Sequence, residues 1–376
     1  MSNPIQAIRN VYDIAKTARD NDLPMSDDEI LLLLKRTVSD TTLISSYSRF
    51  EKGYAAEDLF MRIYSLLPWI KSVVPLGQEQ FPEKSKEQLQ VPDYEIMFEA
   101  GSSSKTSSVL VEVKLIDGDK QTYELQKYKY DVLKKYSQQK HEPLLFGLFW
   151  RKQKIWTINS IESFSKKSSC YKISFYDAML NDLSAIFGDY TYIFPMQYYR
   201  KSTFTSDPDI KTEFIHSHLK YGRTVSEELS LDLKTFKSLN MLEPPVLDCA
   251  FDFKVISVNT LPQAKTELIE QCESIPRIFK LSSLLLAYLC KIYCLDTNTL
   301  YYKDNTVVEN AFNIVDVVRQ KCGGIKYYAL PYIITKEHSN LITLQFGNVQ
   351  RIMNAYQTFP RIDHKIILIE SMRKSL

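Results

Sequence analysis

The segment from residue 91 to residue 118, VPDYEIMFEAGSSSKTSSVLVEVKLIDG, constrains the fold more than any other stretch of the chain. It holds two short apolar runs, PDYEIMFEA and SSVLVEVKLI, joined by the polar sequence GSSSKTSS. Such a pair predicts two β-strands connected by a hairpin loop. Because side chains alternate along a strand, Val111 and Val113 are expected in the core, and Glu112 and Lys114 share the opposite face.

Helices and strands are expected to alternate around this hairpin. The predicted elements, in order, are a helix (47–67), a strand (70–81), the two hairpin strands (92–100 and 107–116), a helix (122–139) and two strands (143–150 and 154–160). This order predicts an α/β domain, a mixed sheet flanked by helices. We expect the domain to span residues 47–195.

Two further segments flank this domain. Residues 1–46 are expected to form helices, one of which begins at Ser26, three residues before Glu29 in the spacing of a capping box. Residues 200–376 are expected to form a mainly helical domain that selects a substrate or partner. Within it, the run over 222–242 has the cadence of a helix-turn-helix, and the apolar run over 281–295 predicts a buried helix too short to span a membrane.

Composition points to a chain that works in a reducing compartment. The chain has 376 residues, a net charge of +2 and six scattered cysteines without a CxxC pair. We therefore expect a cytoplasmic protein without structural zinc, and the N-terminus lacks the pattern of a signal peptide. Cys290 and Cys294 are interpreted as core residues, and His216 and His218 as structural.

The two carboxylates of the hairpin suggest a metal site. Asp93 begins one strand and Glu112 lies on the next, so the two side chains converge on one edge of the sheet. They repel each other unless a cation lies between them, and carboxylate oxygens suit Mg²⁺ or Mn²⁺. Lys114 could then hold its charge against a phosphate oxygen or an attacking hydroxide. The set is suited to phosphodiester hydrolysis.

These residues resemble the PD-(D/E)XK nuclease superfamily, which has a restriction-endonuclease-like fold. The resemblance rests on VPDYEIMF followed by VEVK, on the upstream Glu57, and on Gln126 and Tyr130 in the Q-x-x-x-Y spacing of the subgroup similar to RecB nuclease domains. It covers about residues 47–165. The chain lacks flanking cysteines that match the iron–sulfur ligands of some relatives, so no cluster and no further cofactor are expected.

The resemblance implies a role for each residue. Asp93, Glu112 and the backbone carbonyl of Val113 would bind the Mg²⁺ or Mn²⁺ ion, and Glu57 would bind a second ion directly or through water. Lys114 would position or help deprotonate the attacking water, while Gln126 would steady Lys114 or the scissile phosphate. The implied activity is that of a Mg²⁺-dependent deoxyribonuclease, an endonuclease of a restriction, anti-phage defence or mobile-element system.

The expected partner is nucleic acid, and DNA is expected in preference to RNA. The stretch from Lys120 to Lys140 carries six lysines against two acidic residues and is interleaved with tyrosines. Lys127, Tyr130 and Lys134 are the candidate contacts. The sequence contains no P-loop, so any ATPase or targeting function must come from a protein partner. A dimer is compatible with the sequence, and no membrane partner is expected.

Each assignment has a simpler alternative. Asp93 and Glu112 could be strand-end residues with Lys114 as their salt-bridge partner, and Glu57 could be a solvated helix residue whose role belongs to Glu79. The lysines and tyrosines could form an ordinary helix surface. At the level of the whole chain, the alternative function is a nuclease-like fold used as a non-catalytic DNA- or protein-binding module.

Overall fold

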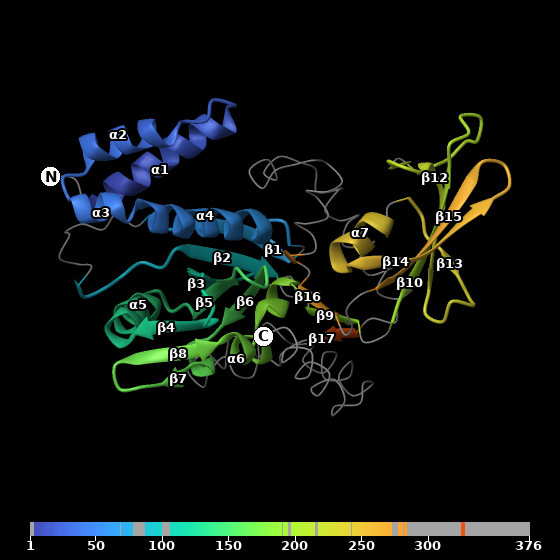
Figure 1. Ribbon diagram of the computed structural model, residues 1–376. Helices are drawn as coiled ribbons and strands as arrows, with labels where there is room; N and C mark the ends of the chain where they lie inside the picture. Colours follow the sequence, from blue (N-terminus) through green and yellow to red (C-terminus); the bar gives the residue numbers. More distant parts are fainter. Residues whose placement is uncertain are drawn as a thin grey trace. The chain divides into compact units, whose positions relative to one another are not determined.

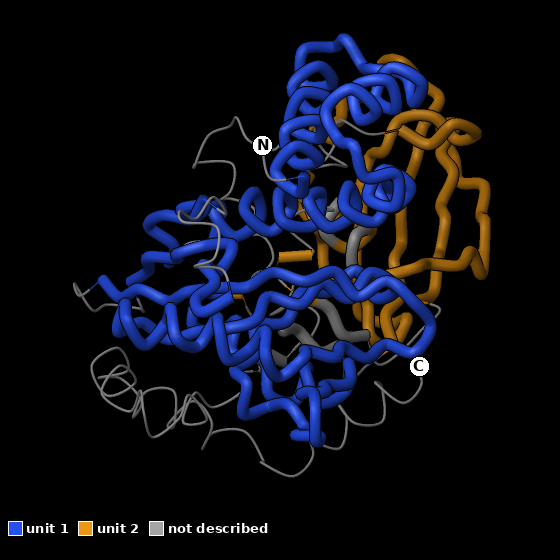
Figure 2. The backbone as a smooth tube through the Cα atoms, turned by 90° about the vertical axis from the view of Figure 1, so that its left-hand side faces the viewer, with its two compact units in different colours: residues 1–188, 296–302, 329–348 blue, residues 189–295, 303–328, 349–376 orange. Residues whose placement is uncertain are grey.

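The computed structural model describes residues 4–67, 69–77, 87–99, 106–189, 191–194, 197–214, 217–241, 243–272, 277–280, 282–283 and 325–327. The chain divides into two compact units, coloured separately in Figure 2. The first contains residues 1–188 together with 296–302 and 329–348, and the second contains the rest. The predicted domain limits, 1–46, 47–195 and 200–376, stay predictions.

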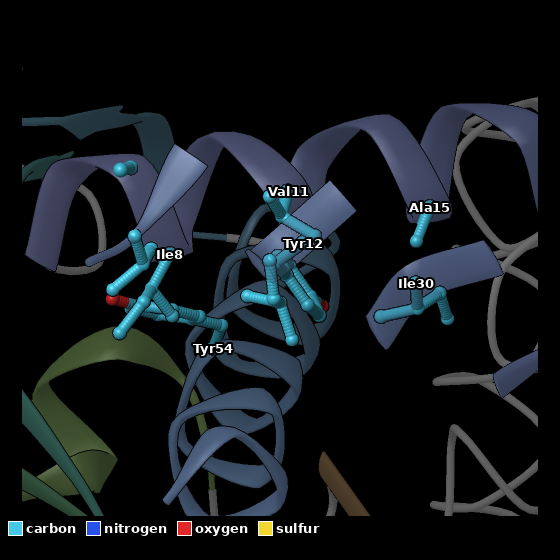
Figure 3. Packing of buried hydrophobic residues seen from close by; sticks show 9 residues of the cluster. Ile8, Val11, Tyr12, Ala15, Ile30 and Tyr54 are labelled. Carbon is cyan, nitrogen blue, oxygen red and sulfur yellow. The ribbon is translucent and has the colours of Figure 1, made fainter. Parts of the chain in front are cut away.

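The first unit begins with four helices: α1 (Pro4–Asp20), α2 (Asp27–Thr37), α3 (Thr41–Ser45) and α4 (Tyr47–Tyr64). The capping box predicted at the start of α2 is confirmed, because the Ser26 side chain accepts from the Glu29 N–H and the Glu29 side chain accepts from the Ser26 N–H. Apolar faces of α1, α2 and α4 form one cluster that includes Ile8, Tyr12, Ile30 and Tyr54 (Figure 3). Burial of this shared core fixes α1 on α4.

A five-stranded sheet forms the centre of this unit. Its order is β1 (Ile70–Pro75), β2 (Tyr94–Glu99), β3 (Thr106–Ile116), β5 (Leu144–Trp150) and β6 (Ile155–Asn159). β3 and β5 run parallel, and the other neighbours are antiparallel. The predicted class, an α/β unit with a mixed sheet flanked by helices, is confirmed, and so is the antiparallel pairing of the predicted hairpin strands.

Helix α4 covers one side of this sheet, and α5 (Lys127–Lys140) lies on the other side (Figure 1). The close approach of α4 depends on Gly147 in β5, because a Cβ there would lie 3.0 Å from the Phe60 ring and 3.3 Å from Val111. Val111 therefore points toward α4. Since side chains alternate along β3, Glu112 and Lys114 point to the opposite side of the sheet.

A small sheet lies beside α5 (Figure 1). It has the order β4 (Thr122–Gln126), β8 (Cys170–Ser174) and β7 (Ser165–Lys166), and the unit closes with η2 (Ile161–Ser163), α6 (Phe175–Leu180) and η3 (Ser184–Phe187). The prediction of a single helix over 122–139 is wrong for its first five residues. Their pairing with β8 makes them a strand, with Leu125 buried at 2% exposure, and the helix begins only at Lys127.

The second unit is mostly β-structure where it is described. One sheet contains β10 (Tyr199–Thr205), β11 (Ser217–His218), β12 (Gly222–Ser230), β13 (Lys237–Ser238), β14 (Phe253–Leu261) and β15 (Lys265–Cys272). Another contains β9 (Thr191–Phe194), β16 (Arg277–Lys280) and β17 (Ile325–Tyr327), and α7 spans Glu243–Ala250. His218 stacks on Tyr221, with their ring centroids 4.6 Å apart.

Two predictions for this part of the chain are wrong. Residues 199–272 are not mainly helical, and the run over 222–242 forms β12 and β13 where a helix-turn-helix was expected. Charged side chains pair across the strands of this sheet, as Arg200 of β10 does with Glu270 of β15 at 2.7 Å. The helix predicted over 281–295, with Cys290 and Cys294, lies outside the described residues apart from 282–283. His216 lies outside them as well. In the described part of the chain, no helix is long and apolar enough to cross a membrane.

Candidate active site

The antiparallel pairing of β2 with β3 brings Asp93 to Glu112. Tyr94 pairs with Val111, so Asp93, one residue earlier, comes opposite Glu112. The Val113 N–H donates to Asp93 Oδ2 at 2.7 Å, which ties the start of β2 to β3. Both carboxylate side chains are only 5% exposed. The structure therefore places the two acidic residues of the predicted hairpin side by side in a nearly dry environment.

Lys114 lies among the oxygen atoms that the resemblance assigns to the metal. Its Nζ is 2.7 Å from Glu112 Oε1 and 3.6 Å from Asp93 Oδ2, and it donates to the Val113 carbonyl at 2.7 Å. The Lys114 side chain is 32% exposed. One ammonium group thus contacts all three predicted ligands, two carboxylates and a carbonyl.

Burial and the nearby charges shift the pKa values of Glu112 and Lys114. Desolvation and, next, the charge of Asp93 raise the pKa of Glu112 to about 7, although Lys114 opposes both. Burial alone would lower the pKa of Lys114, but Asp93 and Glu112 outweigh it and hold that pKa well above its ordinary value. The ammonium of Lys114 therefore lies against both carboxylates and partly offsets their mutual repulsion.

Glu57 on α4 contributes to the same field from a different position. Burial and, next, the charge of Asp93 raise its pKa to about 8, although Lys114 and Arg9 lower it. Its carboxylate forms an ion pair with Arg9 of α1, with Nη1 2.7 Å from Oε2, and its backbone carbonyl accepts from the Tyr94 hydroxyl at 3.0 Å. Glu57 is therefore near Asp93 electrostatically, but its side chain is held by α1. The competing Glu79 lies outside the described residues.

The donors fit a hard divalent ion at the Asp93–Glu112 pair. Glu112 Oε2 is buried and has no hydrogen-bond partner among the described residues, so an oxygen lone pair is available inside the site. Mg²⁺ commonly takes one or two protein carboxylates and keeps several waters, which matches two carboxylates and the Val113 carbonyl. Across the described residues, no group of three or more His, Cys, Asp or Glu side chains is arranged to hold a metal, so Glu57 does not complete such a set here.

Gln126 and Tyr130 occupy the start of α5. Gln126 ends β4, is exposed and makes no side-chain cap on the helix. Tyr130 packs edge-on against Tyr171, with ring centroids 5.0 Å apart, and Lys134 lies over the Tyr130 ring at 5.9 Å. Their predicted roles, and that of Lys127, stay predictions. No hydrogen bond described for this region joins Gln126 to Lys114.

Three residues that sequence reasoning missed contribute to the site. Tyr123 of β4 is close enough for Lys114 to lower its pKa, although burial dominates and raises that pKa to about 12. Lys129 of α5 lowers the pKa of Glu112. Arg9 binds Glu57 from 48 residues away. The alternation of Tyr123 and Leu125 could have indicated a strand facing the site, whereas Arg9 carries no local signal.

Comparisons with known proteins give a limited result. No family model matches the sequence, and no curated protein does. Among solved structures, the Holliday junction resolvase Hjc of the archaeal hyperthermophile Archaeoglobus fulgidus is similar to part of the chain. The match is 16% identical, covers 36% of this chain and 96% of the resolvase chain, and has a TM-score of 0.27. A likeness of this size carries no argument, so function has to be argued from the site.

Proposed function

We propose that this protein is a metal-dependent nuclease of the PD-(D/E)XK type that hydrolyses DNA phosphodiester bonds. The observation that carries the proposal is the contact of Lys114 Nζ with Asp93, Glu112 and the Val113 carbonyl. Two buried carboxylates and a lysine beside the central strand of a sheet are costly for folding, because each charge loses its hydration. A site that binds a divalent ion and a phosphate would explain why the protein keeps this unfavourable arrangement.

The residues have distinct tasks in the proposed reaction. Asp93, Glu112 and the Val113 carbonyl would hold the ion, and the ion would supply charge stabilisation for the phosphate and activation of a water. Lys114 is an ammonium at neutral pH, so it can donate a hydrogen bond to a phosphate oxygen or to the attacking water. Tyr123 is half-buried and close enough to Lys114 for each group to shift the pKa of the other.

Helix α5 supports nucleic acid as the substrate. It carries Lys127, Lys129, Lys134, Lys135 and Lys140 against the single acidic residue Asp131. Tyr128 on the same helix is 65% exposed, so its ring can stack on an unpaired base. Because Lys129 acts on the pKa of Glu112, the basic helix and the carboxylates belong to one electrostatic region. We extend the proposal to Lys127, Tyr130 and Lys134 as substrate contacts.

The biological setting follows only from the resemblance. We propose an endonuclease of a restriction, anti-phage defence or mobile-element system, acting in the cytoplasm with a protein partner for any ATP-driven step. Gln126 is proposed to steady Lys114 or the phosphate after rearrangement of its side chain, and Glu57 to bind a second ion after release from Arg9.

One observation favours the alternative of a non-catalytic binding module. Glu57 and Lys114 are both engaged in ion pairs at 2.7 Å, so the charged groups of the site satisfy one another within the protein. A module that only docks DNA or a protein needs no metal to balance such pairs. It would show no cleavage under any metal condition.

A substrate panel separates the two functions. Purified full-length protein is incubated with supercoiled plasmid, linear duplex, single-stranded DNA and RNA, in Mg²⁺, Mn²⁺ or EDTA. The nuclease proposal expects cleavage of at least one DNA substrate in Mg²⁺ or Mn²⁺ and none in EDTA, and a Lys114→Met variant without cleavage. Binding of DNA without cleavage in any metal would support the docking module and reject the nuclease.

A further inference from the structure

The first unit contains a cavity that is lined by neither carboxylate of the Asp93–Glu112 pair. It lies between α1 and α4, at the ends of β3 and β5, and its volume is about 290 Å³. None of Asp93, Glu112 and Lys114 lines it. Its charged lining consists of five basic side chains and one carboxylate: Lys16, Arg19, Lys52, Arg62, Arg151 and Asp58.

Ion pairs around this cavity leave an excess of positive charge. Lys16 Nζ is 2.7 Å from Asp58, and Arg62 Nη2 is 3.7 Å from Asp20. Lys52 and Arg151 share one carboxylate, that of Asp117, at 3.5 and 2.8 Å. Asp58 is also shared with Arg9, whose Nη2 lies 3.8 Å away, and Asp20 and Asp117 lie outside the cavity lining, so the lining itself is strongly basic.

The rest of the cavity is apolar and held in place by the fold. Leu59 of α4, Leu115 of β3 and Phe149 of β5 line it together with Ala55 and Ala56. The Phe149 ring stacks on Trp156 with centroids 4.7 Å apart, which fixes that wall. Tyr12, labelled in Figure 3, donates to Asp58 at 2.7 Å and fixes the wall formed by α1. A charged rim over a rigid apolar wall is typical of a small-ligand pocket.

We propose that this cavity binds a nucleoside monophosphate. A phosphate monoester carries about −1.5 to −2 charges at pH 7, so the basic lining attracts it more strongly than a backbone phosphodiester, which carries a single charge. The phosphate would bind at Arg19, Lys52 and Arg151, the charged side chains nearest to solvent, and the sugar or base would lie against Leu115 and Phe149. The proposal does not rest on the nuclease activity, because the two sites share no residue.

Binding is tested on the full-length protein in EDTA, which prevents any metal-dependent cleavage. The 5′-monophosphates of the common deoxyribonucleosides are titrated by calorimetry, each beside its nucleoside, with a dinucleoside phosphodiester and inorganic phosphate as further probes. We expect at least one monophosphate to bind about tenfold or more tightly than its nucleoside and than the diester. If no monophosphate binds, or the diester binds as well as the monophosphates, the proposal is wrong.

Variants assign the binding to this cavity. Arg19→Glu with Lys52→Glu lowers the charge of the cavity lining by four, and both residues are exposed, so the core is left unaltered. Ala55→Leu narrows the cavity without a change of charge. Each variant should weaken the monophosphate about tenfold or more.

The matched control is Lys35→Glu with Arg36→Glu, the same charge change at exposed positions of α2 that do not line the cavity. It should bind the monophosphate as the unaltered protein does. Equal weakening in the control and the cavity variant would show only a general effect of net charge and would overturn the assignment. Unchanged binding in both cavity variants would overturn it as well.

Discussion

The raised pKa of Glu112 predicts how the stability of the metal-free protein depends on pH. The folded protein holds this carboxyl at a pKa of about 7, against 4.5 for a free glutamate. Below pH 4.5 the group is protonated in both states and has no effect. As the pH rises toward 7, only the unfolded state ionises, so the free energy of unfolding falls, and above 7 the loss stays constant.

The magnitude follows from the two pKa values. One pKa unit corresponds to about 1.4 kcal/mol, so Glu112 destabilises the metal-free fold by about 3 kcal/mol at pH 8 but by only about 1 kcal/mol at pH 5. Glu112→Gln removes the ionisation and keeps the size of the side chain. Relative to the unaltered protein, this variant should therefore gain about 2 kcal/mol of stability between pH 5 and pH 8.

Urea unfolding in EDTA at both pH values measures this difference. The value at pH 5 serves as the internal reference for packing effects, and Glu87→Gln, at an exposed position, is the matched control. Added Mg²⁺ at pH 8 should stabilise the unaltered protein and not the Glu112→Gln variant, because only a carboxylate binds the ion well. A stability difference between variant and unaltered protein that does not change with pH would refute the reasoning.

Three other predictions concern the surroundings of the site. Arg9→Met removes the ion-pair partner of Glu57, one of two cations that lower the pKa of this carboxyl, so that pKa rises above 8. Thermal melts should therefore show a loss of about 1–3 kcal/mol that is larger at pH 9 than at pH 6. An equal loss at both pH values would contradict the role of Arg9. Gly147→Ala should lower the free energy of unfolding by about 1–3 kcal/mol, because its Cβ meets the Phe60 ring at 3.0 Å. Gly77→Ala, with open space around it, should lower it by less than about 0.5 kcal/mol. Equal melting temperatures for the two variants would contradict the packing. Cleavage assays should show activity with Mg²⁺ or Mn²⁺ and none with Ca²⁺, whose larger and looser coordination aligns the attacking water poorly, and robust cleavage in Ca²⁺ would reject this mechanism.

The strongest local patterns predicted the region around the carboxylates. The run over 107–116 is apolar on both faces, as a strand buried between helices must be, and its alternation alone places Glu112 and Lys114 on one face. The same reasoning recovered β2, β5 and β6. It could not give the distance between Asp93 and Glu112, which depends on the register of two strands joined by an eight-residue polar run.

Long-range contacts account for what the sequence did not predict. The strand over 122–126 precedes a helix of lysines and tyrosines, and only its pairing with residues 170–174 makes it a strand. In the second unit, the buried Glu227 and the paired Glu228 are charged residues on β12, whose pattern suggested a helix surface. Arg9 reached Glu57 only because the apolar faces of α1 and α4 pack together.

The central claim is that Asp93 and Glu112 hold the ion that drives phosphodiester cleavage. The most direct measurement compares the cleavage rates of the unaltered protein, Asp93→Asn, Glu112→Gln and the control Glu87→Gln on the best DNA substrate of the panel, in Mg²⁺, with folding verified by circular dichroism. We predict a loss of about 100-fold or more for each site variant, or about 3 kcal/mol of transition-state stabilisation, and no change for the control. Cleavage by folded Asp93→Asn or Glu112→Gln at the rate of the unaltered protein would contradict the account.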